Sequence, residues 1–80
     1  MPKQKPFNWS EHVRNARTQI PENLGHDEKW TQVALAEILG VSSNYIAMVE
    51  RGEKEPSDLF KRALNFALQM SAHNLDPRAL

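Results

Sequence analysis

The chain has 80 residues, of which 40% are hydrophobic and 25% are charged, a composition typical of one small globular domain. It contains no cysteine, which excludes a disulfide framework and a thiolate metal site. Ten basic residues balance ten acidic ones, so the chain lacks the strongly basic character of many nucleic-acid-binding domains. No apolar run reaches the roughly 18 residues of a membrane span, and we expect a cytoplasmic protein that does not contact a membrane.

Residues 1–7 contain two prolines, two lysines and no hydrophobic periodicity, which predicts a flexible basic arm. This arm is either a plain solvated terminus or a segment that lies along a phosphate backbone or enters a minor groove. The first helix is predicted to begin at Asn8 or Ser10, both good N-cap residues, and to end at Pro21. Its apolar residues share one helical face: Trp9, Val13, Ala16 and Ile20.

Two short helical patterns follow a polar loop over residues 21–29. The second helix is predicted over residues 32–39, with Thr31 as its N-cap and Gly40 at its end, where a glycine can take a left-handed conformation. The third helix is predicted to start from Ser42 as N-cap and to run to about Arg51. Two short helices joined so tightly are the layout of a helix-turn-helix.

The third helix divides into an inner and an outer face. If Ile46 and Val49 point toward the core, a helical rotation of about 100° per residue places Ser43 and Glu50 near the inner edge. Tyr45 then lies on one flank, and the outward positions carry a short amide, a methyl group, a thioether and a guanidinium: Asn44, Ala47, Met48 and Arg51. This face could read a nucleic-acid groove or be an ordinary exposed surface.

The fourth helix is predicted to start from Ser57. It has more apolar residues than one 80-residue monomer is expected to cover, which predicts a dimer or partner surface formed by Leu64, Phe66, Leu68 and Met70. Residues 71–80 contain helix-breaking residues and are predicted to form a C-terminal tail. The pattern as a whole predicts an all-α fold: one domain over residues 8–70, a compact bundle of four to five helices with a central helix-turn-helix at residues 31–52.

The central stretch resembles the Xre/Cro type of helix-turn-helix, the family of the lambdoid phage repressors. The resemblance rests on the residues Gln32, Leu35, Ala36, Leu39, Gly40, Val41, Ser42, Ile46, Glu50, Arg51 and Gly52, followed by Pro56 and Ser57. It implies that the third helix enters the major groove of double-stranded DNA and that the protein binds a palindromic operator as a homodimer.

The same resemblance implies roles for individual residues. Gln32 corresponds to a glutamine that contacts phosphate, and Ser43, Asn44 and Met48 fall at base-reading positions. Glu50 corresponds to a glutamate that pairs with an arginine of the first helix, here Arg17. The inner-edge position of Glu50 also suits a structural ion pair.

The chemistry of these side chains extends the predicted contacts. Asn44 can pair with adenine through two hydrogen bonds, while Ala47 and Met48 can pack on thymine methyl groups, so we expect A·T pairs in each half-site. The predicted base-reading residues are therefore Ser43, Asn44, Ala47 and Met48. Phosphate contacts are predicted for Gln32, Ser42, Tyr45, Arg51 and Lys54.

The chain departs from the family pattern in three respects. The loop before the second helix is longer than usual, Val33 and Ala34 replace polar residues, and a fifth helix after a Gly-Val step is absent. These departures leave the dimer interface undefined.

The leading hypothesis is a sequence-specific transcriptional repressor from a phage, plasmid or other mobile element. One alternative is an antitoxin that binds a toxin through Val33, Phe66 and Met70 and represses its own promoter. Another is a helix-turn-helix module for protein contacts alone, which the neutral charge favours. An enzyme, a metal or a cofactor is not expected, because the three histidines are scattered and no nucleophile–base pair occurs: His12, His26 and His73.

Overall fold

The computed structural model describes residues 7–79, which form four α-helices and a short 3-10 helix and contain no strand. The elements are α1 (Trp9–Asn23), α2 (Gln32–Leu39), α3 (Ser43–Glu50), α4 (Asp58–Ala72) and η1 (Pro77–Ala79). The predicted all-α fold with a central helix-turn-helix is confirmed. The predicted basic arm lies outside the described residues, apart from Phe7.

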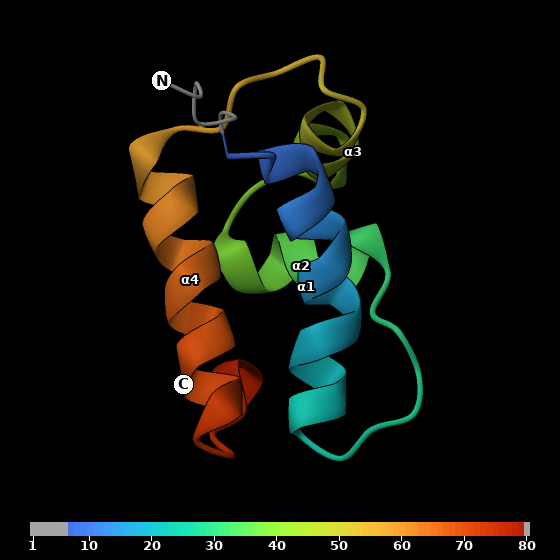
Figure 1. Cartoon of the computed structure of the whole chain (residues 1–80), viewed down its shortest axis with the longest axis vertical. Helices are drawn as coiled ribbons and strands as arrows, with labels where there is room; N and C mark the ends of the chain where they lie inside the picture. The colour runs from blue at the N-terminus through green and yellow to red at the C-terminus, as the bar shows by residue number, and fades with distance from the viewer. Residues whose placement is uncertain (1–6, 80) are drawn as a thin grey trace, which may run out of the picture.

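Helices α1 and α4 pack side by side, α2 runs across them, and α3 lies at one end of the molecule against α1 and α2 (Figure 1). The axes of α2 and α3 differ in direction by 112°, an angle typical of a helix-turn-helix. No single helix of residues 7–79 is long and apolar enough to cross a membrane, and the bent pair α2–α3 passes that test by length and composition only.

Each α-helix begins at a residue whose side chain accepts a backbone N–H of the first turn. Thr31, Ser42 and Ser57 are the N-caps of α2, α3 and α4, as the sequence predicts. For α1 the sequence leaves two candidates, and Asn8 is the N-cap because its Oδ1 accepts the Glu11 N–H at 3.1 Å. The other candidate, Ser10, binds a different helix.

One hydrophobic core joins the four helices. Buried positions at helical spacing on each helix supply it, together with one tryptophan from the loop before α2: Val13, Ala16, Ile20, Trp30, Leu35, Ala36, Ile46, Val49, Phe60, Leu64 and Ala67. Trp9 packs on this core and is half-buried. Fully burying one of the larger aliphatic side chains of this core contributes roughly 1.5–3 kcal/mol.

The predicted end of the first helix at Pro21 is wrong, since α1 continues to Asn23. A proline lacks the N–H that would bind the carbonyl four residues earlier, here that of Arg17. The Trp30 N–H donates to this carbonyl oxygen at 2.8 Å and replaces the missing bond. The loop before α2 therefore lets the helix pass its proline.

The predicted partner surface on α4 is wrong for two of its four residues. Leu64 is fully buried and Met70 is only 9% exposed, so neither can face a partner. Near Met70 the chain turns back, with the Leu75 N–H bound to the Met70 carbonyl at 2.9 Å, and η1 then packs against α4 (Figure 1). Leu68 is half-buried against the core, and Phe66 remains 58% exposed. The expected start of the tail, at residue 71, also falls inside α4.

Candidate functional site

The outward face of α3 contains all four residues predicted to read bases. Ser43 and Asn44 are exposed, and Ala47 and Met48 are half-buried on the same short helix. Ile46 and Val49 are buried on the opposite face, which fixes which side of α3 meets solvent. The structure therefore brings the predicted residues together on one accessible surface.

Two polar side chains of this face are free to bind an external partner. Within residues 7–79, the side chains of Ser43 and Asn44 make no hydrogen bond. An asparagine amide has both donors and an acceptor, the combination that adenine requires in the major groove. The methyl and thioether groups beside it offer apolar contact. The face can thus combine hydrogen bonding with apolar packing, and its only charged group is Arg51, directly after the last residue of α3.

Glu50 connects three helices from the inner side of α3. It is 5% exposed, and its Oε1 accepts hydrogen bonds from Arg17 Nη2 at 2.7 Å and Gln32 Nε2 at 3.3 Å. Arg17 belongs to α1 and Gln32 is the first residue of α2. The ion pair predicted between Arg17 and Glu50 is present in the structure. Gln32 is thus held by a side chain of α3.

Two further residues of α1 bind the carboxyl end of α3. Ser10 Oγ donates to the Val49 carbonyl at 2.8 Å, and Arg14 Nη1 donates to the Glu50 carbonyl at 2.8 Å. Carbonyls in the last turn of a helix lack helical donors, and a positive charge there is favoured by the helix dipole. These contacts fix the orientation of α3 against α1.

The roles of Ser10 and Arg14 do not follow from the sequence patterns described above, which make Ser10 a possible cap and assign Arg14 no contact. A signal for them exists in the spacing. Ser10, Arg14 and Arg17 follow at intervals of four and three, so they share one face of α1. All three bind the last two residues of α3.

Tyr45 connects α3 to the start of α4. Its hydroxyl oxygen accepts the Ser57 N–H at 3.0 Å, and its ring lies 5.2 Å from that of Phe60. The ammonium group of Lys54 lies over the same ring, 5.7 Å from its centre. The hydroxyl hydrogen of Tyr45 remains available as a donor. Tyr45 and Lys54, which are both predicted to contact phosphate, therefore lie next to each other.

The other predicted phosphate contacts are at both ends of α3. Ser42 is exposed at the amino end, where its hydroxyl oxygen accepts the Tyr45 N–H at 3.0 Å. Arg51 follows the last residue of α3, is 56% exposed and forms an ion pair with Glu53. An exposed pair of this kind is weak, so the guanidinium can exchange its partner for a phosphate.

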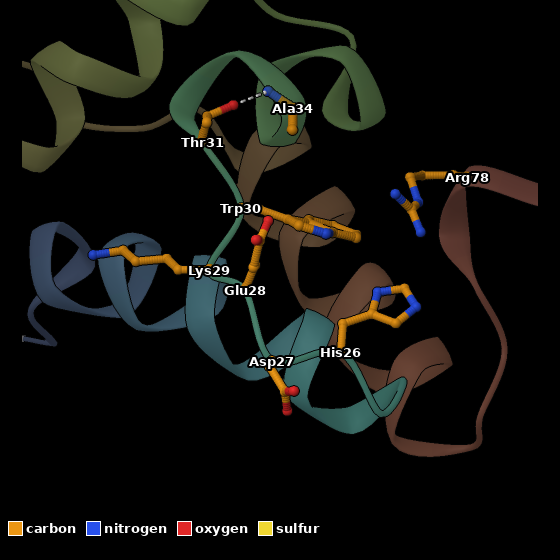
Figure 2. A pocket seen from close by; sticks show the side chains of 8 residues that line it. All are labelled: His26, Asp27, Glu28, Lys29, Trp30, Thr31, Ala34 and Arg78. Carbon is orange, nitrogen blue, oxygen red and sulfur yellow. Dashed lines mark hydrogen bonds between the residues drawn. The ribbon is translucent and has the colours of Figure 1, made fainter.

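A shallow depression lies between the loop before α2 and the C-terminal turn (Figure 2). Arg78 lies over the Trp30 ring, 5.0 Å from its centre, and His26 faces the same opening while Asp27 points away. Asp76 accepts hydrogen bonds from the Arg78 guanidinium at 2.9 and 3.1 Å, which lower the pKa of its carboxyl. The contact of Arg78 with the Trp30 ring attaches the C-terminal turn to the core.

Residues 27–59 match the family model for a helix-turn-helix. This segment includes α2, α3 and the connection to α4, and with them every residue predicted to contact bases or phosphates. It is less than half of the chain, and α1 and most of α4 lie outside it. A comparison with curated proteins found no match, and neither did a comparison with solved structures.

Proposed function

We propose that the protein is a sequence-specific repressor of the Xre/Cro helix-turn-helix type, which the match of residues 27–59 to the helix-turn-helix family model supports. In this proposal, α3 enters the major groove of an operator and two copies bind its two half-sites. Repression follows from occupation of a promoter by the bound dimer.

The observation that carries the proposal is the outward face of α3. Ser43 and Asn44 have unused hydrogen-bonding groups there, next to the apolar side chains of Ala47 and Met48. Asn44 can bind the N6 and N7 atoms of adenine, and the apolar neighbours suit thymine methyl groups. The operator half-site is therefore proposed to contain A·T pairs.

Phosphate contacts are proposed on both sides of this face. Gln32 is at the start of α2 and Ser42 precedes α3, where free backbone N–H groups favour an anion. Tyr45, Arg51 and Lys54 are proposed to contact phosphates from the other end of α3 and the loop after it. Few of these groups are charged, so one copy should bind weakly, and this supports binding as a dimer.

The proposal is tested by an electrophoretic mobility shift with the region upstream of the gene, titrated with salt. We expect a discrete complex that a scrambled duplex of equal length and composition does not compete away. The affinity should fall only moderately with salt, because the number of neutralised phosphates is small. Absence of any complex at low salt would contradict the proposal.

A second candidate function, an antitoxin, is favoured by two exposed apolar side chains, Val33 at 54% and Phe66 at 58% exposure. Met70, which the sequence assigns to the same surface, is buried and does not contribute. This candidate requires a toxin gene beside the gene for this chain. The toxin should form a stoichiometric complex with the wild type and a weaker one with the Val33→Asp, Phe66→Asp variant.

A further inference from the structure

We infer that Glu50 is a positioning residue for DNA binding: it holds the Gln32 side chain so that an amide N–H, rather than the amide oxygen, is presented to a phosphate. This inference rests on the proposed function, since it assigns a mechanism to one of the proposed phosphate contacts. It gives the buried carboxylate a role beyond its ion pair with Arg17.

The geometry places one carboxylate oxygen between two donors. Glu50 Oε1 accepts from Arg17 Nη2 at 2.7 Å and from Gln32 Nε2 at 3.3 Å. Within residues 7–79, the other oxygen, Oε2, is buried and has no hydrogen-bond partner. Both donors thus bind the same oxygen atom of Glu50.

The chemistry of a carboxylate decides which way the Gln32 amide faces. An ionised carboxylate accepts hydrogen bonds and donates none, so only the NH₂ end of the amide can face Glu50. A phosphate is also a pure acceptor, and it would be repelled by an amide that exposed its oxygen. The NH₂ group has two hydrogens, and the one that Glu50 does not bind is the donor that a phosphate needs.

The position of Gln32 suits an anion for a second reason. It is the first residue of α2, where the backbone N–H groups of the first turn have no helical partner. Its half-buried side chain is already fixed by Glu50, so less rotamer freedom is lost when a phosphate binds. The held amide is therefore a preorganised contact.

The support for this arrangement extends into α1 and the loop before α2. Arg17 is itself fixed, because its Nη1 donates to the Trp30 carbonyl at 3.3 Å and its own carbonyl accepts the Trp30 N–H at 2.8 Å. The Glu50 carbonyl is bound by Arg14. Neither partner of the ion pair can easily turn away, so Gln32 keeps its orientation.

The test is a mutant cycle in DNA binding, measured by fluorescence anisotropy on a duplex that the wild type selects from a random pool. The combined variant Arg17→Met, Glu50→Leu removes both charges and leaves no buried charge unpaired. Gln32→Ala in the wild type should weaken binding about tenfold. The combined variant should itself bind the duplex about tenfold more weakly than the wild type. Adding Gln32→Ala to it should lower the affinity by less than about twofold.

Two further variants separate positioning from structural support. Glu50→Gln keeps an acceptor oxygen for Arg17, but its amide can also donate, so it should fix the Gln32 amide less strictly and weaken binding by more than about twofold. Gln69→Ala, which removes the same amide from an exposed position on α4, should leave binding unchanged. If Gln32→Ala weakens binding equally in both backgrounds, the inference is wrong.

A measurement on the wild type alone covers the case in which the combined variant does not fold. ¹⁵N relaxation of the side-chain amides should show Gln32 to be rigid relative to Gln69. Equal mobility of the two amides would overturn the inference. Failure of the wild type to select any duplex would instead contradict the proposed function, so the two failures are distinguishable.

Discussion

Glu50 shows at the scale of one residue how a buried charge can be tolerated in a small domain. Removing a carboxylate and a guanidinium from water is unfavourable, and their mutual attraction offsets this only when the geometry is good. Here Arg17 Nη2 lies 2.7 Å from Glu50 Oε1, and the Arg17 side chain is 14% exposed. Gln32 adds a second donor to the same oxygen. The pair therefore specifies how α1, α2 and α3 fit together more than it adds net stability.

Loss of one partner of this ion pair should therefore be costly for stability. Arg17→Met leaves the Glu50 carboxylate buried without its partner and should lower the free energy of unfolding by about 3–5 kcal/mol. Adding Glu50→Leu should restore most of the loss, because two apolar side chains then replace two charges. Urea unfolding followed by circular dichroism measures both. Arg62→Met, at an exposed position of α4, is the control and should change little. If Arg17→Met alone were as stable as the wild type, this account would be contradicted.

Asp76 gives a prediction about pH. The hydrogen bond from the Arg78 side chain lowers the pKa of its carboxyl below the ordinary value of 3.8. A carboxyl whose pKa is lower in the folded state contributes its stability above the ordinary value and loses it as the pH falls through the folded-state pKa. The contact of Arg78 with Trp30 should therefore weaken below about pH 3.8.

Tryptophan fluorescence in a Trp9→Phe background follows this change, since Trp30 is then the remaining tryptophan. The emission should change in that acidic range, and Asp76→Asn should abolish the transition. A transition of the same size in the asparagine variant would show that another group is responsible.

The joint between α2 and α3 sets the function of the site at the scale of elements. Gly40 ends α2 with a φ of 72°, and the Val41 N–H then binds the Ala36 carbonyl at 3.1 Å. This turn gives the 112° change of direction that leaves one face of α3 free while Ile46 and Val49 enter the core. The left-handed backbone at Gly40 therefore determines which side chains α3 exposes.

Replacing Gly40 tests this directly. Within residues 7–79, a methyl group at position 40 would meet no atom within 4 Å outside the neighbouring backbone, so the effect of a side chain is backbone strain. Gly40→Ala should lower stability by about 1–2 kcal/mol, and Gly40→Asn by less, because asparagine adopts this conformation more readily. Thermal and urea unfolding measure the stability of both variants. A Gly40→Ala variant more stable than Gly40→Asn would contradict the account.

Local signals in the sequence predict most of these elements. Thr31, Ser42 and Ser57 mark three helix starts and Gly40 marks a joint, and each acts within four residues of itself. The end of α1 is mispredicted because the donor that compensates for Pro21 is Trp30, which lies across a loop. A local pattern does not contain that contact.

The outward face of α3 follows from periodicity, whereas the contacts that hold it do not. The bonds of Ser10 and Arg14 to the end of α3 join residues that are 39 and 36 positions apart. The burial of Met70 depends on a turn at the end of α4 that brings η1 back to it. Such features depend on tertiary packing, and the predicted partner surface is wrong at Met70 for this reason.

At the scale of the whole molecule, charge limits how strongly one copy can bind DNA. The formal net charge is zero, and α3 itself carries only the buried Glu50 as a charged residue. Binding that depends little on phosphate neutralisation must use base contacts and a second copy for its affinity. We therefore expect a homodimer on two half-sites about one helical turn apart.

The spacing of the half-sites tests this arrangement. Inserting roughly five base pairs turns the second half-site to the opposite side of the duplex, which a rigid dimer cannot reach. The affinity should fall to that of a duplex with one half-site, while an insertion of about ten base pairs should cost less. If the affinity were the same for the original spacing and for both insertions, the protein would not bind as a rigid dimer. Each copy would then bind its half-site independently.

The claim that the outward face of α3 reads DNA sequence depends most directly on Asn44. Its exposed side chain can be replaced without disturbing the core, so Asn44→Ala should keep the stability of the wild type. The deciding measurement compares the affinities of wild type and variant for the selected operator and for an unrelated duplex. We expect the operator affinity to fall by about 1–3 kcal/mol while the affinity for the unrelated duplex stays unchanged. An equal loss on both duplexes, or no loss on either, would show that Asn44 does not read bases.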